Sequence, residues 1–141
     1  MENKEIYFNL FKQVEKLKNS EDPKRKYEYI LWLGKKLKTP NNNILIPENK
    51  VQGCVSEVFV KASYNKGKLS WEGYSDALIT KGLLAFLIGG MNDLTPKEVI
   101  NVNNKFIEDT GLKASLTPSR SNGFLNILLK MQSQANDFLL E

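Results

Sequence analysis

The stretch that decides the fold is residues 56–88, SEVFVKASYNKGKLSWEGYSDALITKGLLAFLI. Its first half contains two segments of alternating apolar and polar residues on either side of Asn65-Lys66-Gly67, where glycine can adopt a left-handed conformation. These segments predict an antiparallel β-hairpin. The nearly continuous apolar run at 77–88 follows at once and predicts a central helix, which Gly89-Gly90 should end.

Helical periodicity and capping signals predict helices on both sides of this hairpin. The predicted helices are residues 5–19, residues 23–37 after an Asp22 cap, a short helix from the capping box Thr95-Pro96-Lys97-Glu98, residues 104–110 closed by Gly111, and a last helix from Thr117-Pro118. This order indicates an α+β fold in which helices cover a small antiparallel sheet, with or without a third strand. A length of 141 residues and a hydrophobic content of 41% predict one domain over residues 1–141.

The net charge of +4 comes from the N-terminal region. Residues 1–40 contain ten Lys and Arg against six Asp and Glu, whereas the other residues contain ten of each. Three aromatic residues of this region, Tyr27, Tyr29 and Trp32, fit the core pattern of a helix, so nucleic-acid binding is not expected. A solvated basic helix face is the preferred interpretation, with an acidic protein as its candidate partner.

The sequence predicts neither a membrane protein nor a secreted one. Its most apolar segment, residues 77–88, is far shorter than the ~20 residues that a membrane-spanning helix needs. The N-terminus lacks the apolar core of a signal peptide, and a single free cysteine fits a reducing compartment. We therefore expect a cytoplasmic protein.

Cys54 is the only cysteine, and the chain contains no histidine. One thiol cannot form an internal disulfide, a Cys/His zinc or iron–sulfur site, or a Cys–His catalytic pair, so no resident metal or cofactor is expected. A lone thiol can still attack and carry sulfur in exchange with a partner. Gly53 favours this interpretation because it lets another group approach closely, but a buried cysteine that acts as a small hydrophobe is equally consistent.

Two charged residues are candidates for supporting this thiol. Asp76 precedes the apolar run, where a carboxylate in the first turn complements the helix dipole without any other role. Arg120 falls in the first turn of the last helix, where a cation opposes the dipole, so a partner should hold it. Asp76 is the candidate partner, and a solvated surface cation is the alternative for Arg120.

Four motifs occur in an order and at separations that closely resemble the SufE family. They are Val51-x-Gly53-Cys54-x-Ser56, Ser75-Asp76-Ala77 with Lys81-Gly82-Leu83, Gly111-Leu112, and Leu116-Thr117-Pro118-Ser119-Arg120-x-Asn122-Gly123. The chain departs from the family pattern at Thr117, which is usually Ser, at Phe59, which is usually Trp, and at Lys38-Thr39-Pro40, where the family has a tighter Leu-Pro. None of these departures involves the thiol.

The resemblance implies a sulfurtransferase-like carrier with the fold of IscU-type scaffold proteins. Such a protein accepts sulfur from the persulfide of a SufS-like, pyridoxal-phosphate-dependent cysteine desulfurase, stimulates that enzyme, and passes the sulfur to a SufBCD-like iron–sulfur scaffold. The cofactor then belongs to the partner. Cys54 matches the acceptor cysteine of the family, and Gly53, Ser56, Asp76 and Arg120 match supporting or partner-facing positions.

Two other classes of function remain open at this point. A peroxide-reacting or redox-sensing thiol would form a sulfenic acid at Cys54, although the chain has no resolving thiol. A non-catalytic interaction module would use Cys54 only for packing. For the carrier, a cysteine with an ordinary pKa is only a few per cent thiolate at neutral pH, so activation must come from cations, backbone N–H groups or the partner.

Overall fold

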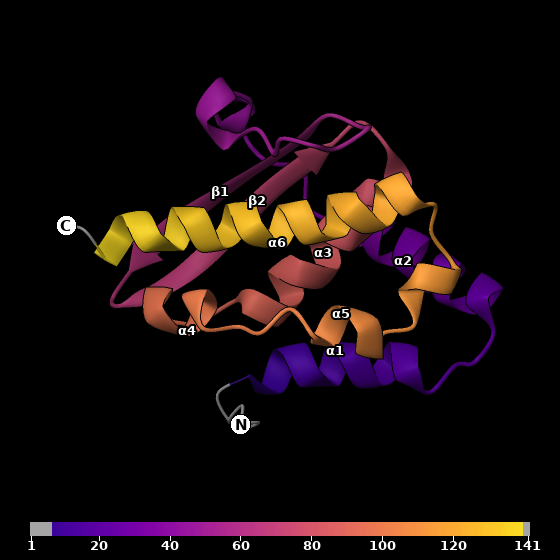
Figure 1. Cartoon of the computed structure of the whole chain (residues 1–141). Coiled ribbons are helices and arrows are strands. Elements are labelled where there is room, and N and C mark those ends of the chain that lie inside the picture. Colours follow the sequence, from indigo (N-terminus) through magenta and orange to yellow (C-terminus); the bar gives the residue numbers. More distant parts are fainter. Residues whose placement is uncertain (1–6, 140–141) are drawn as a thin grey trace.

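The computed structural model describes residues 7–139, in which helices pack against a two-stranded antiparallel sheet (Figure 1). The helices are α1 (Phe8–Lys18), α2 (Pro23–Lys36), α3 (Leu78–Met91), α4 (Pro96–Ile100), α5 (Phe106–Asp109) and α6 (Pro118–Leu139), with short 3₁₀ turns η1 (Asn42–Ile44), η2 (Pro47–Asn49) and η3 (Leu112–Ala114). The strands are β1 (Val58–Asn65) and β2 (Lys68–Ser75). The predicted α+β class is confirmed. The start of the predicted helix 5–19, including Ile6, lies outside the described residues.

The hairpin pairs β1 with β2 from Val58–Ser75 to Asn65–Lys68. The turn is one residue shorter than the sequence predicts, because Asn65 pairs and only Lys66 and Gly67 remain in the loop, both with positive φ. Two positive φ values match the right-handed twist of the strands, which explains the tight turn. A third strand is absent from residues 7–139: the chain before β1 makes only an isolated bridge between Lys50 and Phe59.

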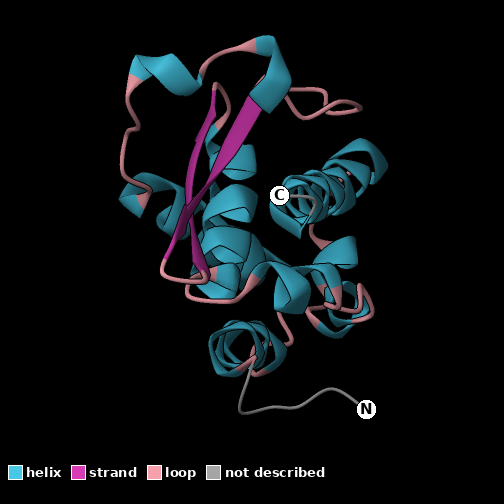
Figure 2. Ribbon diagram, turned by 90° about the vertical axis from the view of Figure 1, so that its left-hand side faces the viewer, coloured by secondary structure: helices cyan, strands magenta, loops and turns pink. Residues whose placement is uncertain are grey.

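Helix α3 forms the centre of the molecule and contacts α1, α2, α6 and β2. Figure 2 shows the hairpin along one side of the molecule, with helices packed beside it. The expected end at Gly89-Gly90 is wrong, because α3 continues through both glycines to Met91. Gly90 lies against Leu10 of α1, where a side chain would clash. Packing therefore outweighs the ~1 kcal/mol that a glycine costs inside a helix.

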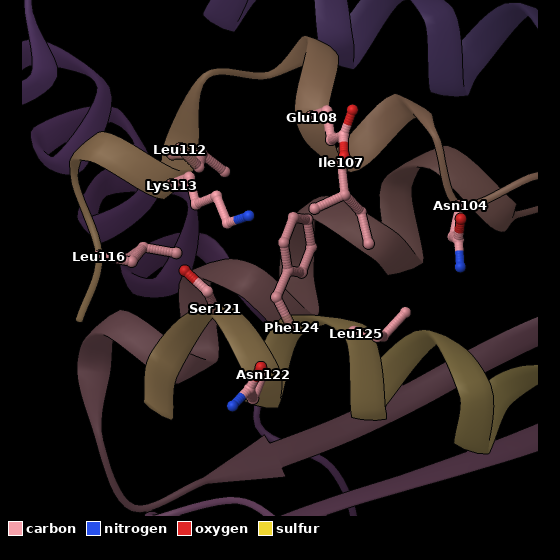
Figure 3. A pocket seen from close by; sticks show the side chains of 10 residues that line it. All are labelled: Asn104, Ile107, Glu108, Leu112, Lys113, Leu116, Ser121, Asn122, Phe124 and Leu125. Carbon is pink, nitrogen blue, oxygen red and sulfur yellow. The ribbon is translucent and has the colours of Figure 1, made fainter. Parts of the chain in front are cut away.

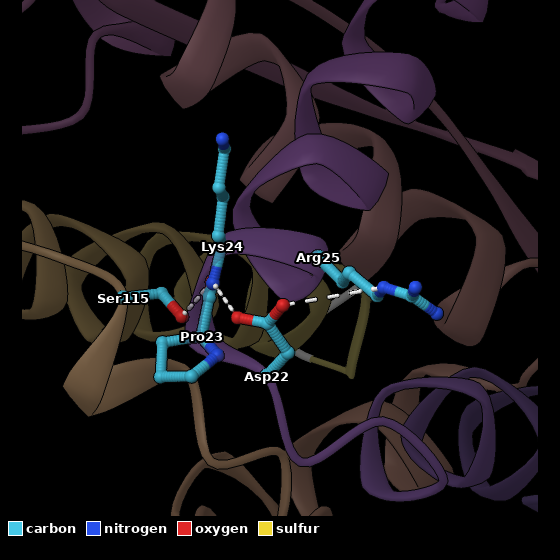
Figure 4. Close-up of polar contacts among 5 residues, drawn as sticks. All are labelled: Asp22, Pro23, Lys24, Arg25 and Ser115. Carbon is cyan, nitrogen blue, oxygen red and sulfur yellow. Dashed lines mark hydrogen bonds and ion pairs between the residues drawn. The ribbon is translucent and has the colours of Figure 1, made fainter.

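The start of α2 is tied to the segment that leads into α6 (Figure 4). Asp22 caps the helix by accepting a hydrogen bond from the Lys24 N–H at 2.9 Å, as the sequence predicts, and its other oxygen lies 4.0 Å from Nε of Arg25. Ser115 donates a hydrogen bond to the Pro23 carbonyl at 2.7 Å. This contact helps to place the segment from which the first turn of α6 begins.

The outward face of α2 differs from the prediction. Tyr27 is 37% exposed and Trp32 is 48% exposed, and Nζ of Lys36 lies 4.1 Å from the centre of the Trp32 ring. The buried stripe consists instead of Lys26, Ile30 and Gly34, spaced four residues apart. The core assignment of Tyr27 and Trp32 is therefore wrong, whereas Tyr29 is partly buried and packs against the core as predicted. The two exposed rings no longer argue against nucleic-acid binding.

Lys26, counted above as part of a solvated basic face, is buried. Its ammonium donates a hydrogen bond to the carbonyl oxygen of Thr110 at 2.7 Å, just before Gly111, whose φ is +70°. The bond joins α2 to the turn that ends α5. The capping box at Thr95 is confirmed, since Thr95 and Glu98 exchange hydrogen bonds of 2.9 and 3.2 Å.

Helix α6 runs along the sheet and protects the free edge of β1. The Gln134 side chain donates to the Val60 carbonyl at 2.7 Å and accepts from the Ala62 N–H at 2.9 Å, so it occupies the place of a neighbouring strand. Near the C-terminus of α6, the Phe138 ring stacks on the Tyr64 ring of β1, with 5.3 Å between the ring centroids. None of the helices in residues 7–139 is long and apolar enough to cross a lipid bilayer.

Two glycines of α3 should respond in opposite ways to the same substitution. A methyl group on Gly82 would overlap the backbone carbonyl of Ile30, so Gly82→Ala should destabilise the protein by about 1–3 kcal/mol or more. Gly89 faces only the end of the flexible Gln13 side chain, so Gly89→Ala should be neutral or stabilise by up to ~1 kcal/mol. Urea unfolding curves measure both. Equal effects would show that α2 and α3 are not in backbone contact at Gly82.

Candidate functional site

Cys54 lies on the loop between the Lys50 bridge and β1, against the N-terminal half of α6. Its side chain is half-buried and packs on the core. The sulfur lies 3.8 Å from the carbonyl oxygen of Gly123, to which the S–H group points as a weak donor. Gly123 has no side chain between the helix backbone and the sulfur, so the thiol rests directly on α6.

Two groups hold the N-terminal side of this loop. Gly53 has a φ of +78°, a conformation that glycine adopts without strain. The side-chain amide of Asn126 on α6 donates a hydrogen bond to the Gly53 carbonyl at 3.1 Å. The peptide group that joins Gly53 to Cys54 is therefore fixed to α6.

The C-terminal side of the loop is held by a chain of side chains from three elements. Arg120 of α6 donates a hydrogen bond through Nη1 to the Thr80 hydroxyl on α3 at 2.9 Å. Thr80 donates in turn to the Ser56 hydroxyl on the loop at 3.4 Å. Separately, the Asp76 carboxylate accepts from the Glu57 N–H at 3.1 Å, and the Asp76 N–H donates to the Glu57 carbonyl at 3.3 Å.

Gly53, Cys54 and Ser56 lie on this loop, Arg120 lies on α6, and Asp76 lies between β2 and α3. Asp76 is therefore not in the first turn of α3, as the sequence suggested. One predicted pairing is also wrong. Within residues 7–139, Arg120 and Asp76 form no ion pair. The Asp76 carboxylate is used by a backbone N–H, and the Arg120 guanidinium reaches the Thr80 hydroxyl instead. Arg120 is thus linked to the Cys54 loop through Thr80 and Ser56, and it is not a solvated surface cation.

Sequence reasoning missed Thr80 and Asn126. Thr80 was visible as the only hydroxyl in the largely apolar run 77–88, which is a sign of a specific hydrogen-bonding role. Asn126 follows Arg120 and Gly123 at steps of three residues, so the three share one face of α6. That shared face could have pointed to Asn126 once Arg120 and Gly123 were assigned to the site.

The surroundings of the thiol favour its neutral form. Burial raises the pKa of the Cys54 thiol above its ordinary value. The contact with Gly123 is to a carbonyl, which stabilises an S–H group and not a thiolate. The described residues also contain no group of three or more Cys, Asp or Glu side chains that could hold a metal ion. Burial and the contact with the Gly123 carbonyl thus keep the resting Cys54 thiol protonated at neutral pH.

A separate hollow of about 240 Å³ lies between α6 and the α5–η3 segment (Figure 3). Phe124, Ile107 and Leu116 line it, and Lys113 extends into it. The buried Ser121 hydroxyl at its wall has no hydrogen-bond partner within the described part of the chain. Gly123 and Asn126, which contact Cys54 and Gly53, do not line this hollow, because it lies on another face of α6. It is not part of the thiol site.

Comparison with known proteins gives the family. The family model "SufE: Fe-S metabolism associated domain" matches residues 12–135. The chain belongs to the SufE family. It is 49% identical over 140 residues to an uncharacterized SufE-like protein of Synechocystis, covering 99% of this chain and 88% of that protein. The resemblance inferred from the four motifs is confirmed, and with it the link to Fe–S metabolism that describes this family.

Two longer relatives match over part of their length. SufE-like protein 1 of Arabidopsis thaliana, chloroplastic/mitochondrial, is 38% identical over 86% of this chain and 33% of that protein. The cysteine desulfuration protein SufE of Plasmodium falciparum is 36% identical over 78% of this chain and 46% of that protein. The chain thus spans less than half the length of these two relatives.

The solution structure of a hypothetical protein from Thermus thermophilus has the same fold, with a TM-score of 0.82. It covers 96% of this chain and 99% of that one at 23% identity. At this identity, the likeness establishes the fold alone. The predicted SufE-like architecture is confirmed by it.

The raised pKa of Cys54 predicts how its reactivity and the stability of the fold depend on pH. At neutral pH the folded protein should react with iodoacetamide more slowly than the urea-unfolded chain, and the midpoint of its pH–rate profile should lie at higher pH than that of the unfolded chain. Because the folded pKa exceeds the unfolded one, burial of the neutral thiol stabilises the fold below the unfolded pKa. This stabilisation is lost as pH rises through the folded pKa.

Alkylation rates and unfolding curves between about pH 6 and 10 test this dependence around the ordinary thiol pKa. Cys54→Ser is the control for stability, since it should lack the thiol-dependent decrease at high pH. A folded thiol that titrates at or below the pKa of the unfolded chain would contradict the prediction, because a cation or backbone donor would then outweigh burial.

Arg120→Lys and Thr80→Val should break the same chain of hydrogen bonds. Each is expected to cost about 1 kcal/mol of unfolding free energy, because lysine lacks the planar guanidinium and valine lacks the hydroxyl. The double variant should lose less than the sum of the two single variants. Thr80→Ser, which keeps the hydroxyl, is the control. Additive losses would show that Arg120 and Thr80 stabilise the protein independently.

Proposed function

We propose that this protein accepts sulfane sulfur on Cys54 from the persulfide of a pyridoxal-phosphate-dependent cysteine desulfurase. The observation that carries the proposal is the position of the only thiol, half-buried on a loop that α3 and α6 hold from both sides. Family membership adds support, since two relatives from Plasmodium are named cysteine desulfuration proteins. Residues 1–141 would act as one SufE-like domain.

The transfer is a displacement at sulfur that needs no oxidant. The Cys54 thiolate attacks the outer sulfur of the donor persulfide, the donor S–S bond breaks, and the donor thiolate leaves. A new S–S bond at Cys54 gives its persulfide. The proton lost by the Cys54 thiol balances the charge of the departing donor thiolate. The number of S–S bonds is the same before and after the step.

Because the thiol is protonated at rest, the Cys54 thiolate would form when the donor protein binds. No hydrogen bond or ion pair within residues 7–139 brings a cation to the sulfur, and burial favours the S–H form. Small thiols and oxidants in solution would therefore react slowly with Cys54. The active site of the desulfurase would supply the environment in which the thiolate forms. Gly53, Ser56, Asp76 and Arg120 would hold the loop until then.

We further propose that the persulfide is passed to an iron–sulfur cluster scaffold, and that the protein works in the cytoplasm. The first step rests on the family description, Fe-S metabolism associated domain. The second rests on the lone thiol, which suits a reducing compartment. The transfer of sulfur to the scaffold would need no cofactor bound to this chain.

Cys54→Ser should abolish sulfur acceptance and leave the fold intact. The hydroxyl keeps the shape of the thiol but is far too weakly acidic to attack a persulfide. The test incubates each protein with a cysteine desulfurase and free cysteine, then measures intact mass and the rate of desulfurase turnover. Wild type should gain sulfur at Cys54 and speed turnover. A Cys54→Ser protein that stimulates turnover as fully as wild type would rule out the carrier mechanism.

The same measurement separates the other two classes of function. A peroxide sensor would gain oxygen at Cys54 from peroxide alone and no sulfur from the desulfurase. An interaction module would gain neither. Only sulfur gain that requires both the desulfurase and Cys54 supports the proposal.

A further inference from the structure

We infer that Asn126 is a positioning residue that holds the Cys54 loop against α6 and thereby keeps the thiol in its slow-reacting form. The inference deepens the proposed function and rests on it for its biological meaning. It concerns the reactivity of the thiol itself, so it can be tested without any donor protein.

The contact between Asn126 and Gly53 is both a hydrogen bond and a close fit. Nδ2 of Asn126 donates to the Gly53 carbonyl at 3.1 Å. A Cβ atom added to Gly53 would lie only 2.6 Å from the same Nδ2 atom. Asn126 therefore occupies the space that a side chain at position 53 would need, and Gly53, with its φ of +78°, is what permits the approach.

This contact acts directly on the reactive residue. The Gly53 carbonyl and the Cys54 nitrogen and Cα belong to one planar peptide group. A hydrogen bond that holds the carbonyl therefore also limits where the Cys54 Cα and its side chain can lie. Gly123, whose carbonyl faces the sulfur at 3.8 Å, lies three residues before Asn126 on the same face of α6. One helix face thus holds both the peptide and the sulfur.

The two ends of the loop are held by different contacts. Ser56 and Glu57 are bound to Thr80 and Asp76, which belong to α3 and the residues just before it. On the thiol's N-terminal side, the Asn126 amide ties the loop to α6. Between the two ends, Val55 is 71% exposed. Loss of the Asn126 contact should therefore release the thiol from α6 while Ser56 and Glu57 stay in place.

Release of the thiol changes its chemistry in a defined direction. Away from α6, the sulfur loses the burial that favours the S–H form, and small reagents gain access to it. A single solvent-accessible hydrogen bond is a weak restraint, so its removal should shift the population of the released loop several-fold without unfolding the protein.

The experiment compares Asn126→Ala with Asn122→Ala, the same substitution one turn earlier on α6. Asn122 is exposed and lines the separate hollow of Figure 3, and no hydrogen bond within residues 7–139 joins its side chain to the Cys54 loop. We expect Asn126→Ala to react with iodoacetamide at pH 7 roughly fivefold faster than wild type, a shift in population that matches the loss of one ordinary hydrogen bond. Asn122→Ala should react at the wild-type rate.

Asn126→Asp is the second variant, because it keeps the size of the side chain but cannot donate to the Gly53 carbonyl when ionised. It should also accelerate alkylation, because the loop loses its donor. In Asn126→Ala, the midpoint of the pH–rate profile should move down toward that of the unfolded chain. In Asn126→Asp, the carboxylate itself disfavours the thiolate, so this variant is judged by its rate alone. Wild-type rates in both variants with a wild-type midpoint in Asn126→Ala, or equal acceleration by Asn122→Ala, would overturn the inference.

Sulfur acceptance from a cysteine desulfurase, measured on the same proteins, separates this inference from the proposed function. If wild type gains no sulfur while Asn126→Ala still shows faster alkylation, the proposed function fails and the role of Asn126 holds. If wild type gains sulfur and Asn126→Ala shows unchanged alkylation, the role of Asn126 fails and the proposed function holds.

Discussion

The backbone contact between α2 and α3 is the constraint on which the rest of the structure depends. Gly82 lies against the Ile30 carbonyl, and a Cβ atom on Gly34 would lie 2.7 Å from the Leu78 carbonyl. Side chains at either glycine would force the two helices apart. Since Thr80 lies on α3 between Leu78 and Gly82, this contact also sets where its hydroxyl lies, and with it the connection from α6 to the Cys54 loop.

The sequence predicted those features that local rules determine. Alternation of apolar residues indicated the hairpin, and the capping box at Thr95 indicated the start of α4, because both depend on neighbouring residues only. The predicted end of α3 was wrong because Gly89-Gly90 is a strong local stop signal that close packing on α1 overrides. Tyr27 and Trp32 of α2 were wrongly assigned to the core because helical periodicity is ambiguous when apolar residues occur on two faces. Only tertiary packing shows which face is buried.

The candidate site was predictable in its chemistry but not in its connections. Elimination left Cys54 as the only soft nucleophile, a conclusion that needs composition alone. The partners of Arg120 and Asp76 could not be deduced, because opposite charges suggest a pair while the folded chain offers each a closer hydroxyl or N–H group. Thr80 and Asn126 act across 24 and 73 residues of sequence, so their roles exist only once the helices have packed.

A carrier of reactive sulfur must meet two opposing requirements, and the geometry around Cys54 addresses both. In the proposed role, the persulfide would have to resist stray thiols and oxidants, and the half-buried position of the Cys54 sulfur against the Gly123 carbonyl would serve this requirement. The Cys54 sulfur would also have to reach a donor and then an acceptor. It must therefore move from its half-buried position to an exposed one at low free-energy cost. The loop is held by a few solvent-accessible hydrogen bonds, and such regions open at much lower free energy than the core, so the loop can move while α3 and α6 stay folded. A cation beside the sulfur would activate the thiol permanently; the absence of one among the contacts of Cys54 in the described chain is thus consistent with activation by the partner.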